Sequence, residues 1–479
     1  MTPSIDGAPG SLVGSEDHVA HQPTDPTAPG EDVRLPRSAF ERPRRVLQPL
    51  QTFLATEAAG GLVLLAAAVT ALVWANSPWR GAYETLWRTG LTLGAEGWTV
   101  SQDLRHWVND GLMALFFLVV GLEIKREVLT GELRTIRAAA LPVIAAVGGM
   151  VVPAVLYLAL NAGGNGRRGW GVPMATDIAF ALGVLTLAAG RARGGLKPFL
   201  LTLAIVDDIG AIVVIAVVYS RSVAWTPVLV AAALAGVAVL LRRIHVRAGA
   251  VYLALGVALW VAVFESGVHA SIAGVVLGLL TPAAPFQRPA AVSREAHRVA
   301  DQTVDDPWPP DADAPQWLSL ARLSREAVSP LARLESALHP WTTFVVVPLF
   351  ALANAGVRLS GDALRGAATS PVTLGVVAGL VLGKVAGILG ASALAVRARV
   401  AALPEGVTWR RLAGAAAVAG IGFTLSIFVA ELAFPSGVLL DRARLGVLVA
   451  SVIAGGLGFA ILRGDRPRGD RRAGDEGRR

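Results

Sequence analysis

The chain of 479 residues contains no cysteine, and only 16% of its residues are charged. Without cysteine it can form neither a disulfide bond nor a thiolate metal site. A soluble domain has about 25% charged residues, whereas this chain is 54% hydrophobic and has a mean hydropathy of +0.56. Several apolar runs reach about 20 residues, which is enough to cross a bilayer. This composition excludes a soluble enzyme, a domain on a single anchor and an outer-membrane barrel, whose strands would alternate.

The apolar runs predict an all-α polytopic membrane protein with about 12 transmembrane helices. The runs lie near 58–76, 108–124, 138–161, 171–189, 196–219, 223–241, 249–264, 267–281, 341–357, 372–395, 412–434 and 444–462. The short neighbours 249–264 and 267–281 are either two half-length helices or one broken element.

The two ends of the chain are polar and basic, and they differ in composition from the membrane domain expected over 47–465. Residues 1–46 and 466–479 hold too few apolar residues to bury a core, so we expect disordered cytoplasmic ends. Within the domain, 282–339 is a long polar stretch rich in proline and charge. Basic loops after alternate runs put this stretch and both termini in the cytoplasm. The net charge of +8 then faces anionic lipid, so no nucleic acid partner is expected.

Four charged residues interrupt the apolar runs: Asp177, Asp207, Asp208 and Lys384. Each charge near mid-membrane costs about 2.5–3.5 kcal/mol. A buried ion pair that fixes helix register explains one aspartate with Lys384. Three acids and one base cannot all pair, so at least two carboxyls must be protonated, bound to a cation or open to water. Such a carboxyl can release a proton and then accept a hard cation, which is the chemistry of proton-for-cation exchange.

The adjacency of the two aspartates and the choice of lysine add two observations. Asp207 and Asp208 point about 100° apart on a helix, so one can face an ion path while the other faces a partner helix. Of the 43 basic residues only three are lysine, and one of them is Lys384. A desolvated lysine can lose its proton and arginine cannot, although the smaller lysine head is an equal explanation.

Glycine and proline predict interrupted helices near Asp177 and in the run 412–434. Gly171, Pro173 and Gly183 flank the aspartate, and Gly420 and Gly422 mark the later run. Two interrupted spans in corresponding halves are typical of a transporter site, where freed backbone groups line a cavity. Close helix packing through small residues is the alternative, and it is favoured for Gly420 and Gly422 taken alone.

Together, short stretches spread over about 50–465 resemble the NhaA family of bacterial sodium/proton antiporters. The matching stretches are Gly121-Leu-Glu-Ile-Lys-Arg-Glu127, Thr176-Asp177, Val206-Asp-Asp-Ile-Gly210, Ser266-Gly-Val-His-Ala-Ser271, Leu338-His-Pro340, Pro348-Leu-Phe-Ala-Leu-Ala-Asn-Ala-Gly356, Gly383-Lys384 and Gly420-Ile-Gly-Phe-Thr424. Each stretch is weakly specific, and the ordered set is highly specific.

The resemblance implies a role for each unusual residue. Asp207 and Asp208 match the pair that binds the cation and the proton, and Lys384 matches the lysine paired with the first of them. Thr176 and Asp177 match the crossing of two unwound helices, where Thr176 belongs with the ion-binding residues and Asp177 balances helix dipoles. Residues matching positions linked to the pH response are Glu123, Arg126, Glu335 and His269. For His269 a helix-end hydrogen bond is an equal explanation.

The resemblance also implies an inverted-repeat architecture with two discontinuous, crossing helices. It implies electrogenic, pH-regulated exchange of internal Na⁺ or Li⁺ for external H⁺ by alternating access, without a cofactor, in a bacterial inner membrane. A homodimer is a further expectation. The long arm before the first run and the insertion in 282–339 depart from the family, so the activation pH stays open.

Two alternatives from other classes use the same residues. An intramembrane aspartyl protease would need Asp177 and Asp208 to face each other and activate water, but it gives Lys384 no role and lacks a glycine-rich segment before an aspartate. A Na⁺-coupled organic anion transporter would need more polar residues in its spans. We therefore expect a transporter and not an enzyme.

Overall fold

The computed structural model describes residues 57–95, 98–189, 194–220, 223–244, 246, 249–302 and 313–464. The chain divides into two units, Met1–Thr52 and Phe53–Arg479, and the described residues all belong to the second. The predicted arm 1–46 and tail 466–479 lie outside the described residues, as do residues 303–312 of the long polar stretch.

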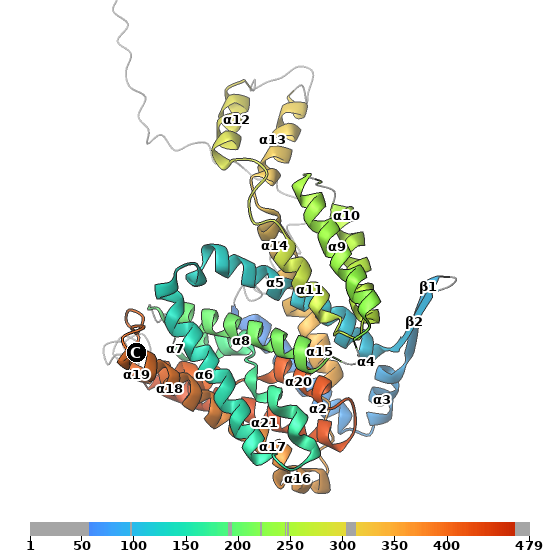
Figure 1. Cartoon of the computed structure of the whole chain (residues 1–479), viewed down its shortest axis with the longest axis vertical. Coiled ribbons are helices and arrows are strands. Elements are labelled where there is room, and N and C mark those ends of the chain that lie inside the picture. Colours follow the sequence, from blue (N-terminus) through green and yellow to red (C-terminus); the bar gives the residue numbers. More distant parts are fainter. Residues whose placement is uncertain are drawn as a thin grey trace, which may run out of the picture. The chain divides into compact units, whose positions relative to one another are not determined.

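Each predicted apolar run falls on a helix of the second unit (Figure 1). These helices are α2 (Glu57–Ala75), α5 (Met113–Thr130), α6 (Ile136–Leu160), α7 (Ile178–Ala189), α8 (Leu196–Val218), α9 (Trp225–Arg243), α10 (Gly249–Glu265), α11 (Ser271–Leu280), α15 (Val347–Asn354), α17 (Pro371–Ala378) with α18 (Lys384–Arg397), α19 (Trp409–Val418) with α20 (Phe423–Ala433), and α21 (Val438–Arg463). By length and composition, six described helices can cross a membrane, or up to nine if each bent pair is one span. The fold is therefore that of a polytopic helical membrane protein.

Burial separates inner from outer helices. In the apolar window of Pro371–Arg397, 61% of the residues are buried, compared with 11% in Trp225–Arg243. Since a helix that is apolar all round must be covered by protein or lipid, the inner helices form the core and α9 has an apolar surface suited to lipid.

Close backbone contacts hold the inner helices α6 and α18 against each other. A Cβ atom on Gly387 would lie 2.2 Å from the carbonyl oxygen of Gly148, and one on Gly383 would lie 2.8 Å from Cα of Pro153. Only glycine allows this approach, which is the small-residue packing expected between membrane helices. The contact sets the position of Lys384, the first residue of α18.

Four irregular helical segments lie next to these helices, three of them π-helical and one a 3₁₀ helix. Segments of π-helix are η1 (Trp107–Leu112), η4 (Thr342–Val346) and η5 (Gly379–Gly383), and η5 ends directly before Lys384. The 3₁₀ helix η3 (Asn165–Met174) meets α7 at a bend of 46°, and α19 meets α20 at 48°. Both bends fall where glycine and proline predicted interrupted helices.

The structure also contains elements that the sequence analysis did not predict. The strands β1 (Gly90–Ala95) and β2 (Trp98–Asp103) pair in antiparallel register, Gly90 with Asp103. The remaining short elements are α3 (Arg80–Arg88), α4 (Leu104–His106), η2 (Glu132–Arg134) and α16 (Gly361–Ala368).

The polar stretch 282–339 is largely helical. It forms α12 (Pro289–Gln302), α13 (Ala314–Glu326) and α14 (Pro330–Trp341). Val292 and Val299 pack with Leu320 between α12 and α13, so this pair has a small core of its own. The ninth helical span begins at Pro330 rather than near 341, because the Ser329 hydroxyl accepts a hydrogen bond from the Ala332 amide (3.2 Å) and caps the helix there.

Candidate ion-binding site

The two bent helices meet at their breaks. The Asp177 amide, in the break before α7, donates to the carbonyl oxygen of Ile421 in the break before α20 (2.7 Å). The Ser426 hydroxyl of α20 donates back to the carbonyl of Val172 in η3 (2.8 Å). Backbone groups that one break leaves without a helical hydrogen bond are therefore bonded by residues at the other break. A helix that is interrupted inside a membrane needs such partners for its free backbone groups.

The Asp177 carboxylate caps two helix N-termini. Its Oδ1 accepts from the Phe180 amide in the first turn of α7 (3.1 Å). Its Oδ2 accepts from the amide (3.1 Å) and the hydroxyl of Thr424, in the first turn of α20. Helix N-termini have a partial positive charge, so both helices stabilise this buried anion and it stabilises both of them. That Asp177 balances helix dipoles stays a prediction, and hydrogen bonds to two helix N-termini are the contacts that such a role requires.

A fully buried ion pair joins Asp207 of α8 to Lys384 of α18. The Lys384 ammonium donates to Asp207 Oδ2, and neither side chain is exposed. The Thr176 hydroxyl lies 2.8 Å from the same Oδ2 and 2.8 Å from the carbonyl oxygen of Ala419. Asp207 thus connects α8 and α18 to both breaks.

Asp208 has no such partner. Its side chain is buried with 3% relative exposure, and its Oδ1 has no hydrogen-bond partner among the described residues. Oδ1 of Asp207 is in the same situation. Leaving a buried polar atom unsatisfied costs about 1–3 kcal/mol, so a proton, a cation or a water molecule is expected at these two oxygens.

The contacts show which of the three aspartates has a partner. Lys384 pairs with Asp207, and two helix ends satisfy Asp177, so Asp208 is the carboxyl left without compensation. The sequence argument required at least two carboxyls to be protonated, cation-bound or hydrated. The helix ends at Asp177 add a form of compensation that is not visible among the charged residues of the sequence.

Gly420 and Gly422 lie in the break and also in close packing. A Cβ on Gly420 would clash with the carbonyl oxygen of Leu380 in η5, and one on Gly422 would lie 3.0 Å from Cδ2 of the same Leu380. The two explanations offered for these glycines therefore both apply.

The residues proposed for the pH response fall in two places. Arg126 of α5 forms an ion pair with Glu335 of α14, and Glu123 Oε1 is 4.0 Å from Nδ1 of His339. Glu123 also interacts electrostatically with Asp208, which links this group to the site. His269 Nε2 instead lies 3.6 Å from Asp110 Oδ1, and the His269 ring is 5.2 Å from the ring of Phe428 on α20.

Two functional candidates were missed by the sequence analysis. Thr424 donates two hydrogen bonds to Asp177, and its place two residues after Gly422 of the break was the available signal. Glu127 of α5 is buried (7% exposed) and accepts from the Thr202 hydroxyl of α8 (3.0 Å). Glu127 ends one of the stretches that resemble the family, but the spacing of residues along α5 does not predict a partner on α8.

Interrupted helices that cross beside an uncompensated buried carboxyl, within a bundle of membrane-length helices, define a secondary transporter. The family model described as Na⁺/H⁺ antiporter 1 matches residues 51–462. The chain is 50% identical over 425 residues to "Na(+)/H(+) antiporter NhaA 2" of Sorangium cellulosum, covering 88% of this chain and 90% of that protein. It is 46% identical over 438 residues to "Na(+)/H(+) antiporter NhaA 3" of Frankia alni, covering 91% of each. The chain therefore belongs to the Na⁺/H⁺ antiporter 1 family.

Proposed function

We propose that the protein exchanges cytoplasmic Na⁺ or Li⁺ for external H⁺ at Asp208, with Asp207 and Thr176 as further oxygen donors. The observation that carries this proposal is the buried Asp208 carboxyl without a hydrogen-bond partner at Oδ1, beside an Asp207 that is already paired. A proton and a small hard cation both neutralise a carboxylate, and both bind through oxygen. They therefore compete for the same atoms.

Charge balance in the site supports electrogenic exchange. With a proton on Asp208, the pair of Asp207 and Lys384 makes the site neutral. When Na⁺ binds both carboxylates, it competes with the Lys384 ammonium for Asp207, and a desolvated lysine can release its proton. Two protons would then leave for one Na⁺, and each cycle would move net charge across the membrane.

Alternating access follows from the crossing of the broken helices. Thr176 touches both Asp207 and Ala419, so a shift of either break moves the coordination of the ion. We assign Asp177 to charge compensation at the two helix ends. We assign Glu123, Arg126 and Glu335 to pH regulation from the cytoplasmic side, and His269 to the pH response from the other side.

The membrane arrangement is part of the same proposal. The twelve predicted runs would each be a span of a domain over 47–465 in a bacterial inner membrane, with inverted-repeat topology, both termini cytoplasmic and no cofactor. A homodimer remains a prediction. Exchange of this kind would serve sodium and pH homeostasis.

The test is Na⁺-dependent collapse of a pH gradient in proteoliposomes containing the purified full chain. Asp208→Asn should abolish the response to Na⁺ and Li⁺. Asp362→Asn, a matched change at a side chain that is 99% exposed, should leave it unchanged. Normal exchange by Asp208→Asn would refute the site assignment.

The protease alternative is disfavoured by the contacts of Asp177. Both of its oxygens accept hydrogen bonds from helix ends, so it is not free to activate water with Asp208. Cleavage of a membrane peptide that stops in Asp177→Asn would support the protease. A current that depends on an organic anion, without Na⁺/H⁺ exchange, would support the Na⁺-coupled organic anion transporter.

A further inference from the structure

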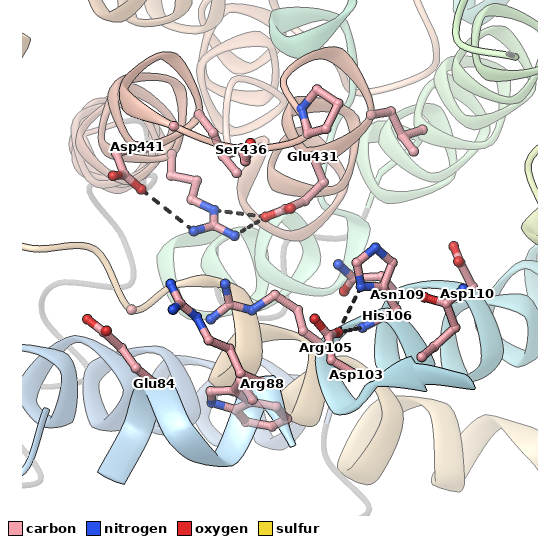
Figure 2. Close-up of a pocket in the computed structure, with 18 of the residues that line it drawn as sticks. Glu84, Arg88, Asp103, Arg105, His106, Asn109, Asp110, Glu431, Ser436 and Asp441 are labelled. Carbon is pink, nitrogen blue, oxygen red and sulfur yellow. Dashed lines mark hydrogen bonds and ion pairs between the residues drawn. The ribbon is translucent and has the colours of Figure 1, made fainter. Parts of the chain in front are cut away.

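A polar cavity of about 800 Å³ lies apart from the buried aspartates of the ion site. Most of its lining comes from the segments that follow the first, seventh, ninth and eleventh predicted runs, and it includes neither Asp207 nor Asp208. Figure 2 shows Glu431 and Asp441 on the wall opposite Asn109. With both termini in the cytoplasm, segments that follow odd-numbered runs lie outside, so in the proposed membrane arrangement the cavity faces the external side.

One face of α20 leads from the crossing of the two breaks to this cavity. Thr424, Phe428 and Glu431 are spaced at i, i+4 and i+7, so they lie on the same side of the helix. Thr424 donates hydrogen bonds to Asp177, and Glu431 lines the cavity. Seven residues rise about 10 Å along a helix. Only about two helical turns therefore separate the crossing from the cavity.

Three buried aromatic rings lie at the middle of this route. The ring centroid of Phe428 is 5.3 Å from that of Phe117 on α5 and 6.0 Å from that of Phe350 on α15. Each of the three residues is at most 2% exposed, and together they are called the aromatic layer. A hydrophobic constriction of this kind excludes water and ions, so the aromatic layer closes the route in this conformation.

A polar layer lies between the aromatic rings and the cavity. Arg444 of α21 forms an ion pair with Glu431, in which Nε donates to Oε1 over 2.8 Å. Nη2 of the same arginine is 3.4 Å from Oδ1 of Asn354 on α15, and the Asn354 amide donates to Oδ1 of Asn109 in η1 (2.7 Å). On both α20 and α15 the polar residue comes one turn after the aromatic residue. The polar layer therefore joins α20 and α21 to α15 and η1.

The ion pair of the polar layer has the properties of a contact that can open. The side chains of Arg444 and Glu431 are only 5% and 11% exposed, and a buried pair resists separation because each charge would be left uncompensated. Arg444 also lies 3.8 Å from Asp441, whose side chain is 59% exposed. If Glu431 separates, Asp441 still balances the arginine, and the glutamate is hydrated by the cavity that it lines.

We propose that Glu431 and Arg444 are the gating pair of an external gate, which holds α20 against α21 and α15 and keeps the aromatic layer closed. The inference rests on the proposed function, because a gate on this route serves alternating access. When the pair separates, the cavity end of α20 is released and the aromatic layer can open. The hydrogen bonds and ion pairs of the two side chains lie within the polar layer and with Asp441, so both are positioning residues that act on access to the ion site.

The test measures the access of an external reagent to a cysteine placed behind the gate. Because the chain contains no cysteine, Val120→Cys provides a single thiol. Val120 is 4% exposed, lies one turn beyond Phe117 on α5 and packs with Ile205, three residues before Asp208. Right-side-out membrane vesicles that contain the full chain receive a membrane-impermeant maleimide on the outside, in sodium-free buffer.

The labelling of Val120→Cys should be slow with the gating pair intact and about tenfold or more faster after Glu431→Gln, because a hydrogen bond between charged groups shifts an equilibrium by that factor. Arg444→Gln and the double variant should show the same increase as Glu431→Gln, since the two residues form one contact. Glu84→Gln, the matched control, removes another ion pair of the same cavity and should label like the parent.

Two further measurements separate the gate from a loosened fold and from the ion site. Val376→Cys places the thiol at a second buried valine, on α17 and 0% exposed, and should stay unlabelled in every variant. The increase caused by Glu431→Gln should persist together with Asp208→Asn, because labelling requires no exchange; failure of the proposed ion site would therefore leave this result intact.

The gating pair is overturned if Glu431→Gln leaves the labelling of Val120→Cys unchanged. It is also overturned if the increase appears equally at Val376→Cys, which reports a loosened fold, or if the effects of the two single variants multiply in the double variant.

Discussion

Replacing Asp177 by asparagine should destabilise the protein, whereas the same change at Asp208 should not. An asparagine at 177 keeps one acceptor oxygen and turns the other into an NH₂ group that faces backbone donors. Either the Phe180 amide or the Thr424 amide then loses its partner, while the Thr424 hydroxyl can rotate and accept. The variant also loses the negative charge that both helix ends stabilise.

The magnitude follows from these two losses. An unpaired buried amide costs about 1–3 kcal/mol, and a charge at a helix N-terminus contributes about 0.3–1 kcal/mol, more when it is buried. Two helix ends bring the sum to about 2–5 kcal/mol. Asp208 forms no ion pair in the described structure and its Oδ1 has no partner, so Asp208→Asn removes a cost rather than a contact and should be neutral or stabilising.

The assay is thermal unfolding of both variants and the wild type in detergent without sodium, with proton-gradient assays on the same samples. Asp177→Asn should have a clearly lower Tm, and Asp208→Asn should have a Tm at or above that of the wild type but no exchange. Equal losses of stability in the two variants would refute the division between a structural and an ion-binding carboxylate. So would an Asp177→Asn protein as stable as the wild type.

Three further predictions can be checked with the same samples. Sodium at 100 times its Kd should stabilise the wild type by about 2.7 kcal/mol and leave the thermal unfolding of Asp208→Asn unchanged. Lys384→Arg keeps the charge partner of Asp207 but cannot release a proton, so its exchange should lose the Na⁺-driven current in solid-supported-membrane recordings; an undiminished current would exclude Lys384 as a proton carrier. Arg358 lowers the pKa of Glu84 below its ordinary value of 4.5. The stabilisation from this exposed pair, below about 1 kcal/mol, is therefore present above that pH and lost as the pH falls, and Glu84→Gln should remove this part of the pH dependence of Tm.

Most of the fold could be predicted from the lengths of the apolar runs. The twelve predicted runs fall on helices, because a helix surrounded by lipid or protein needs a continuous apolar stretch. The start of the ninth span at Pro330 was missed, since its first turns are amphipathic and only the cap at Ser329 marks them. The β1–β2 hairpin was missed because its strands are short and follow no clear alternation.

The site was predictable in its residues but not in its pairing. Three aspartates and a lysine stood out because charge is costly in apolar runs. Which aspartate meets Lys384 depends on the close packing of α6 with α18, through contacts between residues more than 200 positions apart. The role of Thr424 depends on the crossing of two breaks, which no single stretch of sequence contains.

For the proposed exchange at Asp208, the crossing explains why a site for one cation would contain three acids. The broken helices provide two positive N-terminal ends inside the apolar core, and without Asp177 these ends would repel an incoming cation. Asp177 neutralises them, and Lys384 neutralises Asp207, so the charge left to attract Na⁺ or H⁺ is that of Asp208. If Asp177 balanced the ion instead of the helices, its oxygens would be free of backbone donors, and they are not. In the proposed exchange, the affinity for the cation would therefore be set at α8, and its path would be set at the two breaks.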